Sequence, residues 1–259
     1  MNRVSQGFGD TLVLAQRNLI RIVRAPDLLT AFTVQPIMFV LLFVYVFGGA
    51  IAVPAAFDGY ADFLIPGIVI QNIAFGGFAT ALGLADDLNR GLIDRFRSLP
   101  MARAAVLAGR TVADIATNLL SLVIVVVVGL IVGFGFNESV ASIALGFVLA
   151  LMIGYAFSWV FAYIGLVASS PEAANAFGFM AIFPLTFISS AFVPPETMPA
   201  VLEAFAEVNP FTTFVDALRS LWQGVPAGND VWAAFAWTIG ITIAFAIIST
   251  AKYRRTVVK

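Results

Sequence analysis

Long runs of apolar residues dominate the chain, and the charged residues gather in the segments between them. Six windows contain no Asp, Glu, Lys or Arg, and each is long enough to cross a bilayer, which takes about 20 apolar residues. A globular core does not segregate charge in this way. The pattern predicts an all-α integral membrane protein with six transmembrane helices in a single domain, 1–259. The predicted spans are 28–51, 63–85, 115–136, 140–167, 173–193 and 231–251.

The composition supports a lipid environment and removes several classes of chemistry. Of 259 residues, 61% are hydrophobic and only 11% are charged, whereas soluble domains carry about 25% charged residues. The net charge of −1 argues against a nucleic-acid partner, which requires a basic face. The chain has no Cys and no His. We therefore expect no metal site and no catalytic residues of the Ser-His-Asp or Cys-His kind.

The distribution of basic residues predicts the orientation. If the N-terminus is cytoplasmic, 13 of the 14 Lys and Arg residues lie in cytoplasmic connectors, and only Arg219 lies outside. The positive-inside rule counts the basic residues that flank the spans. We therefore expect a multi-pass protein with both termini in the cytoplasm. The first apolar run is 24 residues long and lacks a small-residue cleavage site, so we expect no signal peptide.

An amphipathic segment precedes the first span. On a helix over 11–25, Arg17, Arg21 and Arg24 form one stripe opposite an apolar face, and Pro26 ends the pattern. This pattern is typical of a helix that lies in the membrane interface among lipid headgroups. The alternative is a cytoplasmic flank that only sets the orientation.

The most highly charged stretch, 86–103, follows the second span. Leu88, Leu92, Phe96 and Leu99 recur at helical spacing within it, and Pro100 predicts a stop at Leu99. A short helix with a few apolar side chains suits docking into a groove on a partner. A basic loop that only anchors the topology explains the pattern equally well.

The connector before the sixth span predicts two short helices within 199–223. Asn209 and Pro210 separate them, and Asp216 and Arg219 form an i, i+3 pair on the second. We expect these helices to enter the membrane partway and pack on the spans. A hairpin that lies on the membrane surface is the alternative.

Polar and aromatic residues inside the spans could line a substrate path. Gln35, Gln71, Asn72 and Asn175 fall within the windows, where hydrogen bonds between helices are a more common role than substrate binding. The chain has 25 Phe residues. We select four for a path that accepts an apolar or aromatic substrate: Phe39, Phe43, Phe75 and Phe78.

Several short motifs, taken in order, resemble those of a known family. The stretch RFRSLPMAR follows the second span, and Pro194–Pro195, Asn209–Pro210 and Ala217–Leu218–Arg219 follow the fifth. This order resembles the permease subunits of type-2 ABC exporters, in particular the daunorubicin-resistance permeases. Together with the topology, the resemblance covers nearly the whole chain.

The resemblance implies a function and partners. It implies the membrane subunit of an ATP-driven exporter for an amphiphilic drug-like compound or lipid, in the bacterial cytoplasmic membrane. ATP and Mg would be bound by a separate ATPase subunit, since no lysine of this chain follows a Walker A loop. A second permease chain would complete the path, either another copy in a homodimer or a related permease.

The resemblance also assigns roles to residues. It makes 11–25 a connecting helix at the interface and the segment after the fifth span a pair of re-entrant helices at an outer gate, with Asn209, Pro210 and Arg219. The ATPase-coupling helix carries Asp94, Arg95, Phe96, Arg97, Ser98, Leu99 and Pro100.

Three other functions remain as alternatives. Export of a lipid-linked glycan belongs to the same class of transporter. An ion-coupled carrier needs buried ionisable groups, and Asp114, beside Arg110, is the nearest candidate although a structural ion pair is its expected role. A membrane enzyme would need carboxylates such as Glu196, Glu203 and Glu207, but no motif organises them.

Overall fold

The described part of the chain is entirely helices and their connections. The computed structural model describes residues 26–51, 53–89 and 103–256, and no strand occurs among them, which confirms the all-α fold class. The helices are α2 (Pro26–Leu42), η1 (Phe43–Phe47, a π-helix), α3 (Tyr60–Phe75), α4 (Phe78–Asn89), α6 (Arg103–Ile131), α7 (Val140–Val167), α8 (Pro171–Phe187), η2 (Pro195–Thr197), α9 (Ala200–Val208), α10 (Pro210–Gln223) and α11 (Asp230–Thr256).

Local signals explain where several of these helices begin and end. The Ser139 and Ser170 side chains cap the starts of α7 and α8 by accepting hydrogen bonds from the backbone N–H groups three residues on. Gly224 ends α10 in the left-handed conformation, with φ of 72°. α7 covers the same residues as the fourth charge-free window.

The third charge-free window and the helix that contains most of it, α6, begin and end at different residues. α6 begins at Arg103 and ends at Ile131, with Gly133 at a φ of 104°, whereas the window runs from 115 to 136. Arg110 and Asp114 therefore lie inside a helix, not in a connector. These buried polar groups are tolerated there because each has a partner: Arg110 pairs with Asp87, and Asp114 accepts a hydrogen bond from Thr80.

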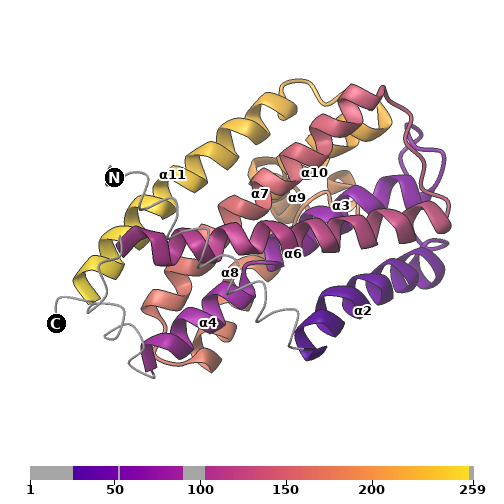
Figure 1. The fold of residues 1–259 in the computed structure, drawn as a ribbon. Helices are drawn as coiled ribbons and strands as arrows, with labels where there is room; N and C mark the ends of the chain where they lie inside the picture. Colours follow the sequence, from indigo (N-terminus) through magenta and orange to yellow (C-terminus); the bar gives the residue numbers. More distant parts are fainter. Residues whose placement is uncertain (1–25, 52, 90–102, 257–259) are drawn as a thin grey trace.

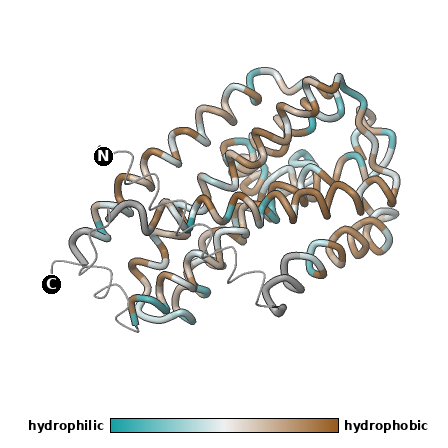
Figure 2. Tube along the Cα trace, viewed as in Figure 1, coloured by the Kyte–Doolittle hydropathy of each residue, from teal (hydrophilic) through white to brown (hydrophobic). Residues whose placement is uncertain are grey.

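Four helical segments of the described chain are long and apolar enough to cross a membrane: Tyr60–Asn89, Leu107–Ile131, Val140–Val167 and Asp230–Tyr253. The apolar stretch Thr33–Phe47 is shorter. Hydrophobic residues occupy most of each helix, and hydrophilic residues gather near the connections (Figure 2).

The helices form an elongated bundle in which α7 packs against α3, α4, α6, α10 and α11 (Figure 1). At one end, which we call the α10 end, the connection 132–139 meets α10 and the start of α3. At the opposite end, the α4 end, the last turns of α4 and α11 lie near the first turns of α6. The cavity described next lies between α2, α3, α4 and α8.

Candidate functional site

A break between α3 and α4 creates one wall of the site. Gly76 and Gly77 separate the two helices, and a Cβ on either would overlap a neighbouring side chain, Asn118 or Phe161. The break brings Phe75 and Phe78 face to face, with ring centroids 5.4 Å apart. Glycine at both positions therefore leaves room for Asn118 and Phe161 beside the break.

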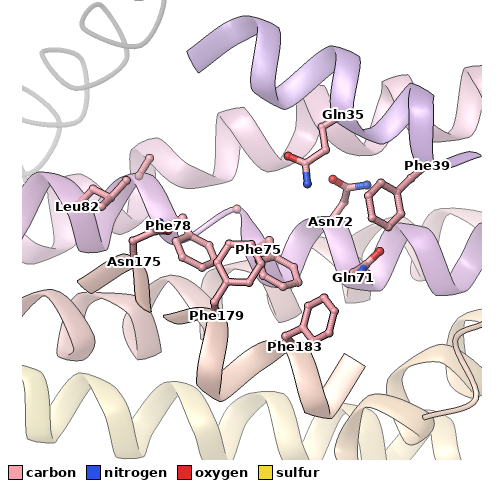
Figure 3. A pocket seen from close by; sticks show the side chains of 12 residues that line it. Gln35, Phe39, Gln71, Asn72, Phe75, Phe78, Leu82, Asn175, Phe179 and Phe183 are labelled. Atoms are coloured by element: carbon pink, nitrogen blue, oxygen red, sulfur yellow. The ribbon is translucent and has the colours of Figure 1, made fainter. Parts of the chain in front are cut away.

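A cavity of about 250 Å³ opens beside this break. Among the residues that the structure describes, none of those lining it is charged, and its walls combine phenylalanine rings with carboxamides (Figure 3). A cavity with aromatic faces and carboxamides suits an amphiphilic molecule. The lining residues are Gln35, Phe39, Gln71, Asn72, Phe75, Gly76, Phe78, Ala79, Leu82, Asn175, Phe179 and Phe183.

The four carboxamides selected from the sequence all reach this cavity. Gln35, Gln71 and Asn72 lie on the side of Phe39, and Asn175 lies near Leu82 (Figure 3). Within the described part of the chain, none of the four makes a hydrogen bond, so they do not serve as links between helices here. Their donors and acceptors remain available to a ligand or a second protein surface.

The four predicted phenylalanines belong to one continuous series of aromatic contacts. Phe39, Phe75 and Phe78 line the cavity, whereas Phe43 lies beyond it and stacks on Phe39 (5.9 Å) and on Phe192 (4.7 Å). From Phe75 the series runs along α8 to the α10 end. Its further members are Phe179, Phe183, Phe187 and Phe192.

The aromatic residues that α8 contributes were not predicted from the sequence, although Asn175 of the same helix was. Phe179, Phe183 and Phe187 recur every fourth residue, which places them on one helical face, and Asn175 continues the same face. This spacing is visible in the sequence. What it does not reveal is which face of α8 is turned toward α3.

At the α10 end, Asn209 holds the two short helices and α8 together. Its side-chain N–H groups donate to the carbonyl oxygens of Leu185 (2.7 Å) and Ile188 (2.6 Å), and its Oδ1 accepts from the N–H of Phe211 (3.0 Å). Asn209 therefore caps the end of α8 and the start of α10 at once, with Pro210 as the first residue of α10.

Arg219 of α10 is buried among backbone carbonyls. The predicted i, i+3 pair forms, with 2.8 Å between the Arg219 guanidinium and the Asp216 carboxylate. The guanidinium also donates to the carbonyl oxygens of Phe63 (2.7 and 3.1 Å) and Ser190 (2.8 Å), and it lies 3.8 Å from the Phe63 ring centroid. Burial lowers the pKa of Arg219, and the Asp216 carboxylate opposes that shift. Arg219 thus ties α10 to α3 and to the turn after α8.

Two groups of predicted residues lie outside the described part of the chain. These are the interfacial residues Arg17, Arg21 and Arg24, and the coupling residues 94–100. In the described part, no group of three or more acidic, His or Cys side chains is arranged to hold a metal ion.

The fold is that of a helical membrane protein whose bundle contains a cavity lined by phenylalanines and carboxamides. Residues 10–222 match the ABC-2 type transporter family, and the chain belongs to that family. It is therefore a multi-pass membrane protein and the permease subunit of an ABC transporter.

Drug-resistance permeases are among its relatives. The chain is 32% identical to the daunorubicin resistance ABC transporter permease protein DrrB1 of Streptomyces coeruleorubidus, over 94% of this chain and 86% of that protein. It is 26% identical to the doxorubicin resistance ABC transporter permease protein DrrB of Mycobacterium tuberculosis, over 72% of this chain and 65% of that protein.

Proposed function

We propose that this permease exports amphiphilic, drug-like compounds or lipids from the cytoplasmic membrane of a bacterium. The observation that carries the proposal is the uncharged cavity between α2, α3, α4 and α8, with its five phenylalanines and four unpaired carboxamides. Aromatic faces bind the apolar body of such a molecule, and carboxamides bind its hydroxyl or carbonyl groups. The similarity to daunorubicin and doxorubicin resistance permeases supports the same substrate class.

The proposed topology has six spans with both termini in the cytoplasm. Besides the four long apolar segments, it counts α2 with η1 as the first span and α8 as the fifth. The excess of Lys and Arg in the connectors at the α4 end makes that end cytoplasmic. The α10 end, with its two short helices, is then the outer side, where they would act as a gate.

ATP hydrolysis is assigned to a separate subunit that also binds Mg. The segment with residues 94–100 docks on that ATPase, and the apolar side chains of Phe96 and Leu99 supply the contact. ATP binding then closes the ATPase and moves the helices as rigid bodies. This chain contributes the path and the mechanical connection.

A second copy of the chain completes the path. Gln35 and Asn175 are solvent-exposed in the single chain, among exposed apolar side chains of α2 and α8 such as Met38 and Met180. Carboxamides facing lipid without a partner are unfavourable. The same face of a second copy, related by a twofold axis, would cover them and join the two cavities.

The proposal is tested by substrate-stimulated ATPase activity. The tagged chain is purified in mild detergent with its co-expressed ATPase, and hydrolysis is measured with and without daunorubicin as the probe. We expect stimulation in the wild type and its loss in Asn72→Leu, which keeps the volume and removes the polar group. Ile243→Leu, an exposed change on α11 outside the cavity lining and outside the proposed dimer face, is the control. Equal stimulation in all three would overturn the assignment of the cavity.

The partner and the topology are tested separately. Phe96→Asp with Leu99→Asp is expected to abolish co-purification of the ATPase and leave membrane insertion intact. A Cys at Glu203 is expected to react with an impermeant reagent from outside intact cells, and one at Arg97 is not. Retained ATPase, or the reversed labelling, would contradict the docking role or the orientation.

A further inference from the structure

Buried polar side chains join α4 to α6 near the α4 end. Asp87, two residues before the end of α4, forms an ion pair with Arg110 of α6, and the two side chains are only 5% and 7% exposed. Farther into the bundle, Thr80 of α4 donates a hydrogen bond to Asp114 of α6 (2.7 Å). Ser158 of α7 also faces the Asp114 carboxylate. This cluster is separate from the cavity and from the α10 end.

The two links connect the helices at different levels. Thr80 and Asp87 are seven residues apart, about 10 Å along α4, and Arg110 and Asp114 are four residues apart, about 6 Å along α6. A single link would leave one helix free to pivot about it. Two links at separate levels fix both the separation and the crossing angle of α4 and α6.

These side chains connect the two helices directly, beside an apolar cluster that Leu84 of α4 shares with Leu107 of α6. The backbone of α4 packs mainly against α7 and α8 and approaches α6 at few points. Gly83 lies between Thr80 and Asp87 on the same face of α4, and a Cβ there would overlap the Arg110 guanidinium. The missing side chain at Gly83 therefore lets Arg110 reach Asp87.

The cluster lies between the segment 90–102 and the cavity, because α4 and α6 flank that segment and α4 also lines the cavity. α4 precedes the segment 90–102 and α6 follows it, so a force applied to that segment enters the bundle through both helices. α4 also contributes Phe78 and Leu82 to the cavity wall. A buried ion pair often stabilises a fold no more than apolar side chains of similar volume would. The Asp87–Arg110 pair is therefore better explained by the fixed position that it gives α4 relative to α6 than by its effect on folding stability.

We propose that the Asp87–Arg110 and Thr80–Asp114 links make α4 and α6 move as one unit, and so transmit movement of the ATPase to the cavity wall. The ATPase part of this inference rests on the proposed function; the rigid connection does not. The four residues are positioning residues that touch neither nucleotide nor substrate.

The first test measures daunorubicin transport per ATP hydrolysed, in vesicles that contain the chain and its ATPase. Arg110→Gln and Thr80→Val are expected to keep the ATPase bound and active while transport per ATP falls roughly tenfold. Gly83→Ala, which displaces Arg110 without changing a charge, is expected to act in the same direction. Arg110→Lys keeps the charge and should recover part of the loss.

Gly240→Ala, in which the added Cβ meets open space within a span, is the matched control. Unchanged transport per ATP in Arg110→Gln, Thr80→Val and Gly83→Ala would overturn the inference.

The second test measures the linkage itself and separates its failure from that of the proposed function. Because the chain has no Cys, spin labels at Asn89→Cys on α4 and Ala116→Cys on α6 report one distance. Both positions are exposed. We expect a narrow distribution in the wild type, with or without ATP and ATPase, and a broad one in Arg110→Gln and Gly83→Ala. A distribution as narrow in these variants as in the wild type would overturn the inference. If the distribution is narrow in the wild type and broad in Arg110→Gln and Gly83→Ala, but the chain does not bind the ATPase, the linkage is supported and the proposed function is rejected.

Discussion

Single polar side chains supply the hydrogen bonds that irregular backbone lacks at the α10 end. Asn209 pairs with two carbonyls at the end of α8, and Arg219 pairs with those of Phe63 and Ser190. Inside a protein that faces lipid, such carbonyls have no water to bond instead. We therefore expect substitution of Asn209 or Arg219 to lower the stability of the fold, because several buried carbonyls lose their donor at once.

At Asn209, we expect Asn209→Ala to destabilise the chain because both carbonyls and the cap of α10 lose their partner. Loss of a cap costs about 0.5–2 kcal/mol, and each buried acceptor left unpaired costs about 1–3 kcal/mol. The melting temperature in detergent should fall by about 5 °C or more. Asn89→Ala, the same change at an exposed site at the end of α4, should leave it unchanged.

At Arg219, we expect stability to fall in the order wild type, Arg219→Lys, Arg219→Gln. Lysine keeps the charge beside Asp216 but cannot reproduce the fork that reaches two carbonyls. Glutamine leaves the partly exposed Asp216 without its cation and removes donors to the Phe63 and Ser190 carbonyls, and each buried acceptor left unpaired costs about 1–3 kcal/mol. Chemical denaturation of the purified chain measures the order. Equal stability of the lysine and glutamine variants would contradict it.

At the scale of elements, α3 and the turn after α8 approach each other at a glycine. Gly67 lies against the backbone of Ala191, and a Cβ on Gly67 would overlap that backbone. Tyr60 donates to the carbonyl of Phe192 beside this contact (3.2 Å). The close approach holds the end of α8, and with it the last rings of the aromatic series, against α3.

Gly67→Ala is expected to push the turn away from α3, because backbone cannot move aside as a flexible side chain can. Overpacking of this kind costs about 1–3 kcal/mol. The melting temperature should fall, and limited proteolysis should cut faster within 188–193. In Gly240→Ala, where the added Cβ meets open space, neither should change. Equal behaviour of the two variants would show that the turn does not depend on this contact.

At the scale of the whole molecule, the burial of the spans differs strongly. Most of Tyr60–Asn89 is buried within the chain, whereas only 11% of the Asp230–Tyr253 window is. The exposed apolar surface of α11 is suited to contact with lipid. The α2 and α8 face is also exposed, but it carries unpaired carboxamides, which is why we place the second copy there.

A cross-linking experiment distinguishes these two faces. The chain has no native Cys, so Met38→Cys or Met180→Cys introduces one thiol on the α2 and α8 face, and Ile243→Cys introduces one on α11. Under mild oxidation in membranes, we expect a disulfide-linked dimer from Met38→Cys or Met180→Cys. Ile243→Cys should remain a monomer. A dimer from Ile243→Cys alone would move the interface to α11.

The sequence by itself determined the fold class and much of the helix layout, because both follow from local patterns. Apolar runs without charges predicted helices in lipid, and Asn209 and Pro210 marked the break between α9 and α10. The order of motifs from 95 to 219 led to the family that the match over residues 10–222 establishes. These features depend on neighbours in the chain, and so they are readable one segment at a time.

Only the tertiary structure decided which distant residues meet. It gathered Gln35, Asn72 and Asn175 around one cavity and paired Arg110 with Asp87 on another helix. An apolar helix in lipid has no strong amphipathic stripe to reveal its inward face; the hydrophobic and polar sides of α7 scarcely differ. The rotation of each helix is set instead by close contacts at glycines such as Gly67 and Gly83, and these appear only when the helices are packed.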